Sequence, residues 1–356
     1  MKVTNPDGTT RTTSYDDVSN VKTVTDENGH QTSYGYDWGG RLLWVRQFTS
    51  PTSYYLTSYT YDQSGNLLST TDSNAAVTSY QYDDLNRLVK TAYPDGTAES
   101  RSYDSVGNLI SRTTPAGVVI GYSYDSANRL TRVGYPDATT LAYSYDADGD
   151  LLSMVTSSAS TFYAYNARNW ATNQTEVVGG KRYSVLYGYD SVGNIVSTAY
   201  PDGYALSISY DALNRVHQLG TFATFLYTPD SKLSRISYGD GQVATYSYDS
   251  RDRPTRILVR TGSQTQLDLN YTYDSVGNVL SIDGERYSYD WLNRLTSARG
   301  TWAPISYSYD GAGNLLNKTV GTTTTSYKYG VYNRLTSAGS VTLAYDANGN
   351  TVTKVN

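Results

Sequence analysis

The chain has no cysteine, which excludes disulfide bonds, thiolate catalysis and cysteine-ligated metal sites. Only two histidines, His30 and His217, could supply an imidazole, and neither has partners spaced as in a metal or catalytic site. No apolar run reaches the ~18 residues that a membrane-spanning helix requires. The first ten residues lack the apolar core of a secretion signal. We therefore expect no disulfide staple, no membrane span and no signal peptide in this chain.

Basic clusters are missing as well. The 28 Lys and Arg residues are outnumbered by 33 Asp and Glu residues, and the net charge is −5. Proteins that follow nucleic acid phosphates concentrate basic residues in a patch, so nucleic acid is not an expected partner. No Gly-x-Ser-x-Gly elbow, phosphate-binding glycine loop or zinc signature occurs. We predict no catalytic, cofactor-binding or metal-ligating residue and no cofactor.

Tyrosine dominates what is present, with 38 copies against 4 Phe and 5 Trp. The aromatic area is thus supplied by a side chain with a polar tip, which suits a partly wet sheet face better than a dry core. Thr, Val, Ser and Tyr are all frequent, and this composition favours strands over helices. Helical periodicity is absent, so almost no helix is expected.

One landmark, a Tyr that is usually followed by Asp, recurs through the whole chain in one register. The spacing is mostly 20 or 21 residues, which indicates an array of about seventeen units rather than separate domains. The landmark tyrosines are Tyr15, Tyr36, Tyr61, Tyr82, Tyr103, Tyr124, Tyr145, Tyr165, Tyr189, Tyr210, Tyr227, Tyr248, Tyr273, Tyr289, Tyr309, Tyr329 and Tyr345.

Each unit contains two turn signals. The first, which we call the Tyr-Asp turn, directly follows the landmark tyrosine; the second, the mid-unit turn, lies about eleven residues after it, as in Tyr93-Pro94-Asp95-Gly96. Two turns in ~21 residues leave two strands of about seven residues, so each unit is predicted to be a β-hairpin. Some thirty strands should result.

The Tyr-Asp turns alternate between a Gly-Asn form, as in Gly107-Asn108, and an Asn-Arg form, as in Asn86-Arg87. The structural period is therefore about 42 residues, a pair of hairpins. Gly and Asn both supply the positive φ of a turn, whereas the arginine requires another explanation. We expect each arginine to contact Asp residues of the adjoining units, giving a ladder along one edge of the sheet. The alternative is that the arginine only keeps the turn soluble. The seven positions are Arg41, Arg87, Arg129, Arg215, Arg253, Arg294 and Arg334.

The segments from Tyr103 to Leu109 and from Tyr289 to Leu295 resemble the YD repeats of the Rhs family, and the resemblance extends over residues 12–350. That family includes bacterial Rhs polymorphic toxins, the C subunits of Tc toxins and the animal teneurins. The resemblance implies an all-β fold in which tandem hairpins form one continuous antiparallel sheet that spirals into a hollow shell or an open curved ribbon. Residues 1–356 are expected to form a single array.

In those relatives the shell encloses a toxin, or serves as an adhesion scaffold in teneurins. The resemblance therefore implies a polypeptide cargo or neighbouring shell segments as partners, and a secreted or cell-surface location within a larger protein. The aspartyl self-cleavage motif of the bacterial cages has no counterpart, because no Asp-Pro dipeptide occurs. We expect a fragment or a short array without protease or toxin. Its two open edges predict end-to-end self-association.

Two other features can be interpreted either as structural parts of the repeat or as binding sites. Asp146, Asp148 and Asp150 suggest a calcium loop, but the segment aligns with every other Tyr-Asp turn and no Glu closes the loop. The tyrosines could stack on one another across strands and hold the sheet together, which we favour for any single ring, or could line a surface for a cargo or sugar.

We conclude from the sequence that the chain is a non-catalytic structural shell. A cargo polypeptide held inside such a shell could not reach a partner or fold freely. The alternative is an extracellular adhesion or carbohydrate-binding module that uses the tyrosine-rich surface. An enzyme is the third and weakest hypothesis.

Overall fold

The computed structural model describes residues 1–355, and nearly all of them belong to one meandering antiparallel sheet of 35 strands. The first seventeen are β1 (Lys2–Thr4), β2 (Thr10–Tyr15), β3 (Val21–Thr25), β4 (Gln31–Tyr36), β5 (Leu42–Phe48), β6 (Tyr54–Tyr61), β7 (Leu67–Thr71), β8 (Val77–Tyr82), β9 (Leu88–Ala92), β10 (Ala98–Tyr103), β11 (Leu109–Thr113), β12 (Val119–Tyr124), β13 (Leu130–Gly134), β14 (Thr140–Tyr145), β15 (Leu151–Val155), β16 (Ala159–Tyr165) and β17 (Ala171–Val178). The others are β18 (Lys181–Tyr189), β19 (Ile195–Ala199), β20 (Ala205–Tyr210), β21 (Val216–Leu219), β22 (Ala223–Tyr227), β23 (Leu233–Tyr238), β24 (Gln242–Tyr248), β25 (Pro254–Thr261), β26 (Gln264–Tyr273), β27 (Val279–Ile282), β28 (Glu285–Tyr289), β29 (Leu295–Arg299), β30 (Ile305–Tyr309), β31 (Leu315–Val320), β32 (Thr323–Tyr329), β33 (Leu335–Ala338), β34 (Val341–Tyr345) and β35 (Thr351–Val355).

The all-β prediction is confirmed. Every strand pairs with the next one in the chain, from β1–β2 to β34–β35, so the sheet has two free edge strands. Strands are mostly five or six residues long, somewhat shorter than expected, because the turns take more of each unit. The single helical element of residues 1–355 is one 3₁₀ turn, η1 (Val331–Asn333). No helix in this described part is long and apolar enough to cross a membrane.

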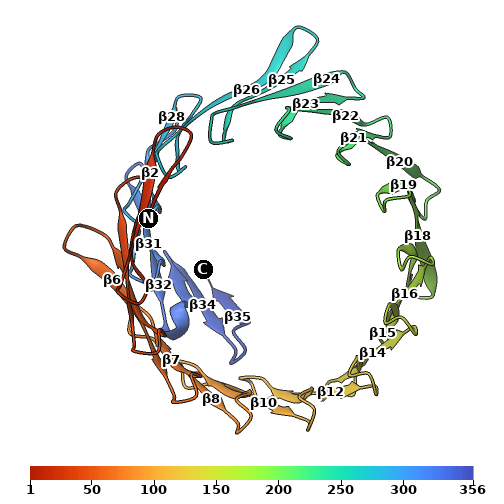
Figure 1. Cartoon of the computed structure of the whole chain (residues 1–356), viewed down its shortest axis with the longest axis horizontal. Coiled ribbons are helices and arrows are strands. Elements are labelled where there is room, and N and C mark those ends of the chain that lie inside the picture. Colours follow the sequence, from red (N-terminus) through yellow and green to blue (C-terminus); the bar gives the residue numbers. More distant parts are fainter. Residues whose placement is uncertain (356) are drawn as a thin grey trace.

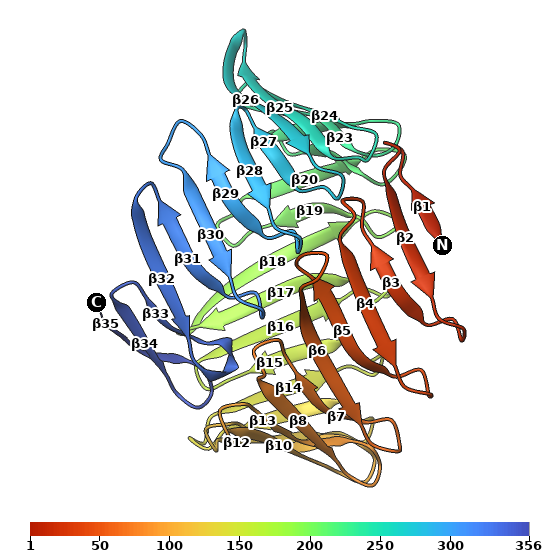
Figure 2. The same ribbon diagram turned by 90° about the vertical axis from the view of Figure 1, so that its left-hand side faces the viewer.

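The sheet coils into a wide spiral that passes once around and then overlaps its own beginning (Figure 1). Strands β28 to β32 lie beside β2 to β6 when the spiral is seen from the side (Figure 2). Side-chain contacts between the coils join residues that are 224 to 261 positions apart. Strand twist, summed over the hairpins, therefore brings the sheet back onto itself after about 240 residues.

The wall of the spiral is one sheet thick and has almost no dry core. Among the described residues the buried side chains are few and small, and four of the nine are polar or charged: Thr91, Glu99, Thr175, Thr198, Val133, Ala223, Ile236, Ala244 and Ala298. Both faces are thus partly wet, which explains why the aromatic residue of this protein is tyrosine rather than phenylalanine. Stability must come from cross-strand pairs and from polar contacts at the turns.

Candidate functional site

The Tyr-Asp turn is held by its aspartate. In the turn that begins at Asp83, one carboxylate oxygen accepts the backbone N–H groups of Leu85 and Arg87 at 3.0 and 2.9 Å. The other oxygen accepts Nε of Arg87 at 2.7 Å. Asn86 takes the positive φ of 59° that closes the turn. The Arg87 N–H and its guanidinium hold the pKa of Asp83 below its ordinary value.

The arginine extends from its own turn to the next one. Nη1 of Arg87 donates to the backbone oxygen of Asp104 at 2.8 Å, and its guanidinium lies 4.9 Å from the ring centre of Tyr103. The predicted ladder is confirmed, but its partners are corrected. For six of the seven arginines, all except Arg334, the carboxylate that pairs with the guanidinium belongs to the same turn, four residues earlier, because the turn folds the two side chains together. The adjoining unit supplies a carbonyl oxygen and a tyrosine ring instead.

The Gly-Asn turns continue this ladder. Asn108 donates to Oδ2 of Asp104 at 2.9 Å and also to the side-chain oxygen of Asn128 in the next turn at 2.9 Å. The same double contact recurs from Asn66, Asn278 and Asn314. The two forms alternate because each kind of turn reaches the other kind. Arginine reaches a backbone oxygen of a Gly-Asn turn, and asparagine reaches the side chain of an Asn-Arg turn.

Asp150 interrupts the ladder, because it occupies the position that is Asn in most sister turns. Its backbone N–H donates to Asp146, but its own Oδ2 is buried and, within residues 1–355, has no hydrogen-bond partner. Burial and the nearby carboxylates of Asp146 and Asp148 raise the pKa of Asp150. The described residues hold no cluster of three or more side chains suited to a metal ion.

Asp150→Asn should stabilise the protein, since an amide at this position can donate to Asp146 as Asn108 donates to Asp104. The raised pKa means that the wild type loses stability as pH rises through it, whereas the variant does not. The gain in urea midpoint should be largest at pH 7 and should vanish below the ordinary pKa of 3.8. An equal gain in urea midpoint at pH 7 and below the ordinary pKa of 3.8 would show that the charge of the Asp150 carboxylate does not cause the difference in stability.

The landmark tyrosines are fixed through their hydroxyl groups. Thirteen of them donate to the backbone oxygen of the residue that begins a strand of the preceding hairpin, as Tyr124 does to Leu109 at 2.9 Å. That oxygen lies at a β-bulge, where Leu109 pairs with Tyr103 and the regular ladder is interrupted. The hydroxyl thus supplies a hydrogen bond to a backbone carbonyl at the bulge, where the regular strand pairing is interrupted.

The expected stacking of tyrosines across strands is wrong for most of the array. Landmark tyrosines occupy every second strand, about 10 Å apart, which exceeds the 4.5–7 Å of stacked rings. Arginine guanidinium groups fill the space between them, as Arg129 does over Tyr145 at 4.9 Å. The structural role that we favoured for tyrosine is supported, through the hydroxyl and the cation rather than through ring pairs.

Tyr165→Phe should destabilise the protein by about 0.5–1.5 kcal/mol, because the carbonyl of Leu151 loses its 2.9 Å hydrogen bond. Tyr163→Phe is the matched control, since Tyr163 belongs to the same strand and face but makes no such bond within the described residues. Urea unfolding followed by circular dichroism provides the measurement. Equal effects of the two substitutions would contradict the role assigned to the hydroxyl.

A seam joins the first coil to the second, and we use this name for the contacts between mid-unit turns of residues 5–117 and Tyr-Asp turns of residues 249–350. Asn28 donates to Asp274 at 2.9 Å, and Arg251 lies 3.4 Å from Asp7. Trp291 stacks on His30 with ring centres 4.9 Å apart. The further seam pairs are Asn74 with Asp310, Asn333 with Asp72, Arg334 with Asp95, Tyr332 with Tyr93, and Asn348 with the backbone of Ala116.

No feature of the repeat pattern indicates the seam. The structure places His30 in a mid-unit turn packed against the opposite coil. His217 is exposed on β21 and takes no part in the seam contacts named above. Arg334 has no aspartate in its own turn, because that turn begins at Gly330. Its guanidinium instead lies 3.4 Å from Asp95 on the opposite coil.

The wall also holds a buried charge that was not predicted from the sequence. Glu99 in β10 is only 3% exposed and accepts Nε of Arg112 at 2.8 Å, while Arg101 pairs with its other oxygen. The carboxylate raises the pKa of Arg112. The only signal is that a glutamate alternates with Arg101 and Tyr103 on one strand face, and such alternation alone does not distinguish a surface pair from a buried one.

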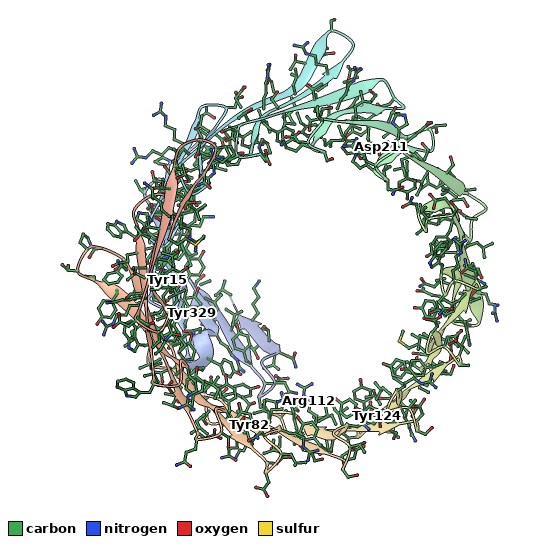
Figure 3. All side chains as sticks on the ribbon, in the orientation of Figure 1. Tyr15, Tyr82, Arg112, Tyr124, Asp211 and Tyr329 are labelled. Carbon is green, nitrogen blue, oxygen red and sulfur yellow. The ribbon has the colours of Figure 1, made fainter. Side chains whose placement is uncertain are left out.

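The space enclosed by the spiral is open. Side chains project from both faces of the wall and leave the centre of the ring free (Figure 3). The last strands, β32 to β35, lie within the outline of the ring, at one end of the spiral (Figures 1 and 2). The wall therefore bounds a lumen, and its C-terminal strands turn in toward the opening.

This geometry defines a shell protein built from a coiled strip of hairpins whose polar side chains mainly hold the strip together. The chain belongs to the teneurin YD-shell family, whose sequence model matches residues 94–225 and 245–356, more than half of the chain. The RHS repeat model matches residues 61–98. The resemblance stated from the sequence is thus confirmed.

Two relatives are toxin subunits of Yersinia entomophaga. Toxin subunit YenC1 is 29% identical over 136 residues, which are 31% of this chain and 14% of the relative. Toxin subunit YenC2 is 31% identical over 141 residues, 33% of this chain and 14% of the relative. The matched part is therefore a small share of each toxin subunit.

Solved structures share the fold over nearly the whole chain. The TcdB2–TccC3 crystal structure superposes with a TM-score of 0.80 at 16% identity and covers 98% of this chain and 25% of its own. The Tc holotoxin pore of Photorhabdus luminescens gives a TM-score of 0.79 at 16% identity, over 97% of this chain and 24% of its own. At this identity the likeness establishes the architecture alone.

Proposed function

We propose that residues 1–356 form a single array that serves as the wall of a container for a polypeptide. The observation that carries this proposal is the seam, since a strip that bonds to its own second coil bounds a lumen instead of remaining an open ribbon. Confinement is the mechanism: a chain inside the wall cannot reach a partner or complete its folding.

The chemistry of the wall supports a passive role. Most landmark tyrosine hydroxyls, turn aspartates and turn arginines are engaged in holding the strip, so few are free to bind a ligand or take part in a reaction. For this reason we favour a non-catalytic shell over an adhesion module that uses the tyrosines. The relatives are toxin subunits, and by that likeness we infer a toxin-type cargo carried elsewhere, in a protein that is secreted or displayed at the cell surface.

The test uses a reporter polypeptide appended to the C-terminus, where the last strands lie within the outline of the ring (Figure 1). The reporter should resist a protease that cleaves it freely when it is attached to an unrelated carrier. A seam variant, Arg251→Ala with Trp291→Ala, provides the matched control, because its hairpins stay intact while the coils can separate. Equal cleavage of the reporter on the wild type and on the free carrier would overturn the proposal.

A further inference from the structure

The spiral has two rims of different chemistry. Antiparallel hairpins place all Tyr-Asp turns along one rim and all mid-unit turns along the other. The seam unites the two kinds of rim, but only in part. Within the described residues, mid-unit turns after residue 117 and Tyr-Asp turns before residue 249 make no hydrogen bond, ion pair or aromatic contact with another coil.

The sequence repeats allow the covered and uncovered Tyr-Asp turns to be compared directly. Asp-Ser-Val-Gly-Asn occurs at residues 104–108, 190–194 and 274–278. Val276, in the seam, is half-buried, whereas Val106 and Val192 on the free rim are 70% and 66% exposed. Trp291 and Trp38 both directly follow the turn aspartate; Trp291 stacks in the seam, and Trp38 is fully exposed. The free Tyr-Asp rim thus presents the same apolar side chains that the seam covers.

The free mid-unit rim has the matching acceptors. In the seam, Tyr93 packs on Tyr332, and Asp95 of the same Tyr-Pro-Asp turn accepts Arg334. Tyr-Pro-Asp recurs at residues 135–137 and 200–202, where Tyr135 and Tyr200 are exposed.

An apolar groove of about 790 Å³ lies beside the second of these turns. The groove is lined by Tyr183, Tyr200, Tyr204, Leu219 and Phe222, and all of these side chains except Leu219 are exposed. Exposed apolar surface of this kind commonly marks an interaction site.

We infer that the Tyr-Asp rim of a second copy of this chain docks on the free mid-unit rim of the first, coil on coil, in the manner of the seam. Continuity with the seam is what favours a second copy, because this chain already recognises its own turns through the same two rims. Each copy carries one rim of each kind, so the contact is heterologous and head-to-tail. It buries the exposed aromatic groove and extends the wall along the axis of the spiral.

This mode differs from the end-to-end association expected from the open edges. β1 and β35 both run from a Tyr-Asp turn position toward the mid-unit rim, so they cannot pair antiparallel unless one copy is inverted. A joint between these edges would therefore reverse the rims of the second copy. Rim stacking keeps the orientation of the coils that the seam already shows.

Two rim variants test the inference. The Tyr-Asp rim variant carries Trp38→Ala, Val106→Ser and Val192→Ser; the mid-unit rim variant carries Tyr135→Ser, Tyr200→Ser and Phe222→Ser. In sedimentation over a concentration series, the wild type should form dimers and longer stacks. Each variant alone should associate at least about tenfold more weakly. Circular dichroism identical to the wild type confirms that each variant is folded.

An equimolar mixture of the two variants separates this contact from all others. Each partner keeps one intact rim of opposite kind, so the mixture should yield a one-to-one dimer that does not grow further. A wild type that stays monomeric throughout, or a mixture that stays monomeric, overturns the inference. So does association that both rim variants retain but that Val352→Lys in edge strand β35 abolishes, since this would identify edge pairing instead. None of these results bears on the capture of a cargo.

Discussion

Replacing Trp291 and Arg251 by alanine should open the spiral along the seam without unfolding its hairpins. Trp291 loses its stack on His30, and Arg251 loses its ion pair with Asp7. Neither side chain supports the strand ladder, which runs through backbone bonds between consecutive strands. The coils should therefore separate, because within residues 1–355 strands pair only with their neighbours in the chain and no strand pairing joins the first coil to the second.

Small-angle scattering provides the measurement. The radius of gyration and the largest dimension of the double variant should both rise, while its far-ultraviolet circular dichroism stays that of the wild type. At a protein concentration where the wild type is monomeric, Trp38→Ala is the matched control, because Trp38 holds the same place in its turn as Trp291 but faces no second coil of its own chain. If scattering from the double variant is unchanged, the seam does not close the spiral, and the container proposal loses its main support.

The repeat made most of this fold predictable. The landmark tyrosines fix the register of each hairpin, because a two-residue step keeps Tyr122 and Tyr124 on one strand face. Turn chemistry located the Tyr-Asp turns, since Gly and Asn occur at the positions where φ is positive, as at Gly107 and Asn128. These features are local in sequence, and they recur in each repeat unit.

The features that were not predicted depend on rotations summed over many hairpins or on contacts between particular side chains. The seam requires that small rotations of each hairpin add up to one coil in about 240 residues, and no single unit encodes that sum. The Arg87–Asp83 pair was assigned to the wrong unit because strand spacing was considered and the folding of the turn was not. Arg101 lies on the same strand as Glu99, but Arg112 meets Glu99 only after β10 and β11 are placed side by side.

Glu99→Ala should cost the protein about 2–3 kcal/mol of stability. Removing one partner of a buried ion pair costs about 3–5 kcal/mol when the remaining charge stays buried, and Arg101 and Arg112 can recover part of their hydration. Their side chains are 27% and 40% exposed, against 4% for Glu99, so the loss falls below that range. Hydrogen exchange should show the loss in β9 to β12, because a repeat array opens locally.

Two control variants define the cause. Glu176→Ala removes an exposed glutamate from the same sheet and should shift the urea midpoint little. Glu99→Gln keeps the volume and a carbonyl acceptor but not the charge, so it should fall between Glu99→Ala and the wild type. If Glu99→Gln is as stable as the wild type, packing rather than the ion pair with Arg112 accounts for the burial of Glu99. If Glu99→Ala is itself neutral, the wall at β10 does not depend on this charge, and its stability rests on the turn ladder and the tyrosine hydroxyls alone.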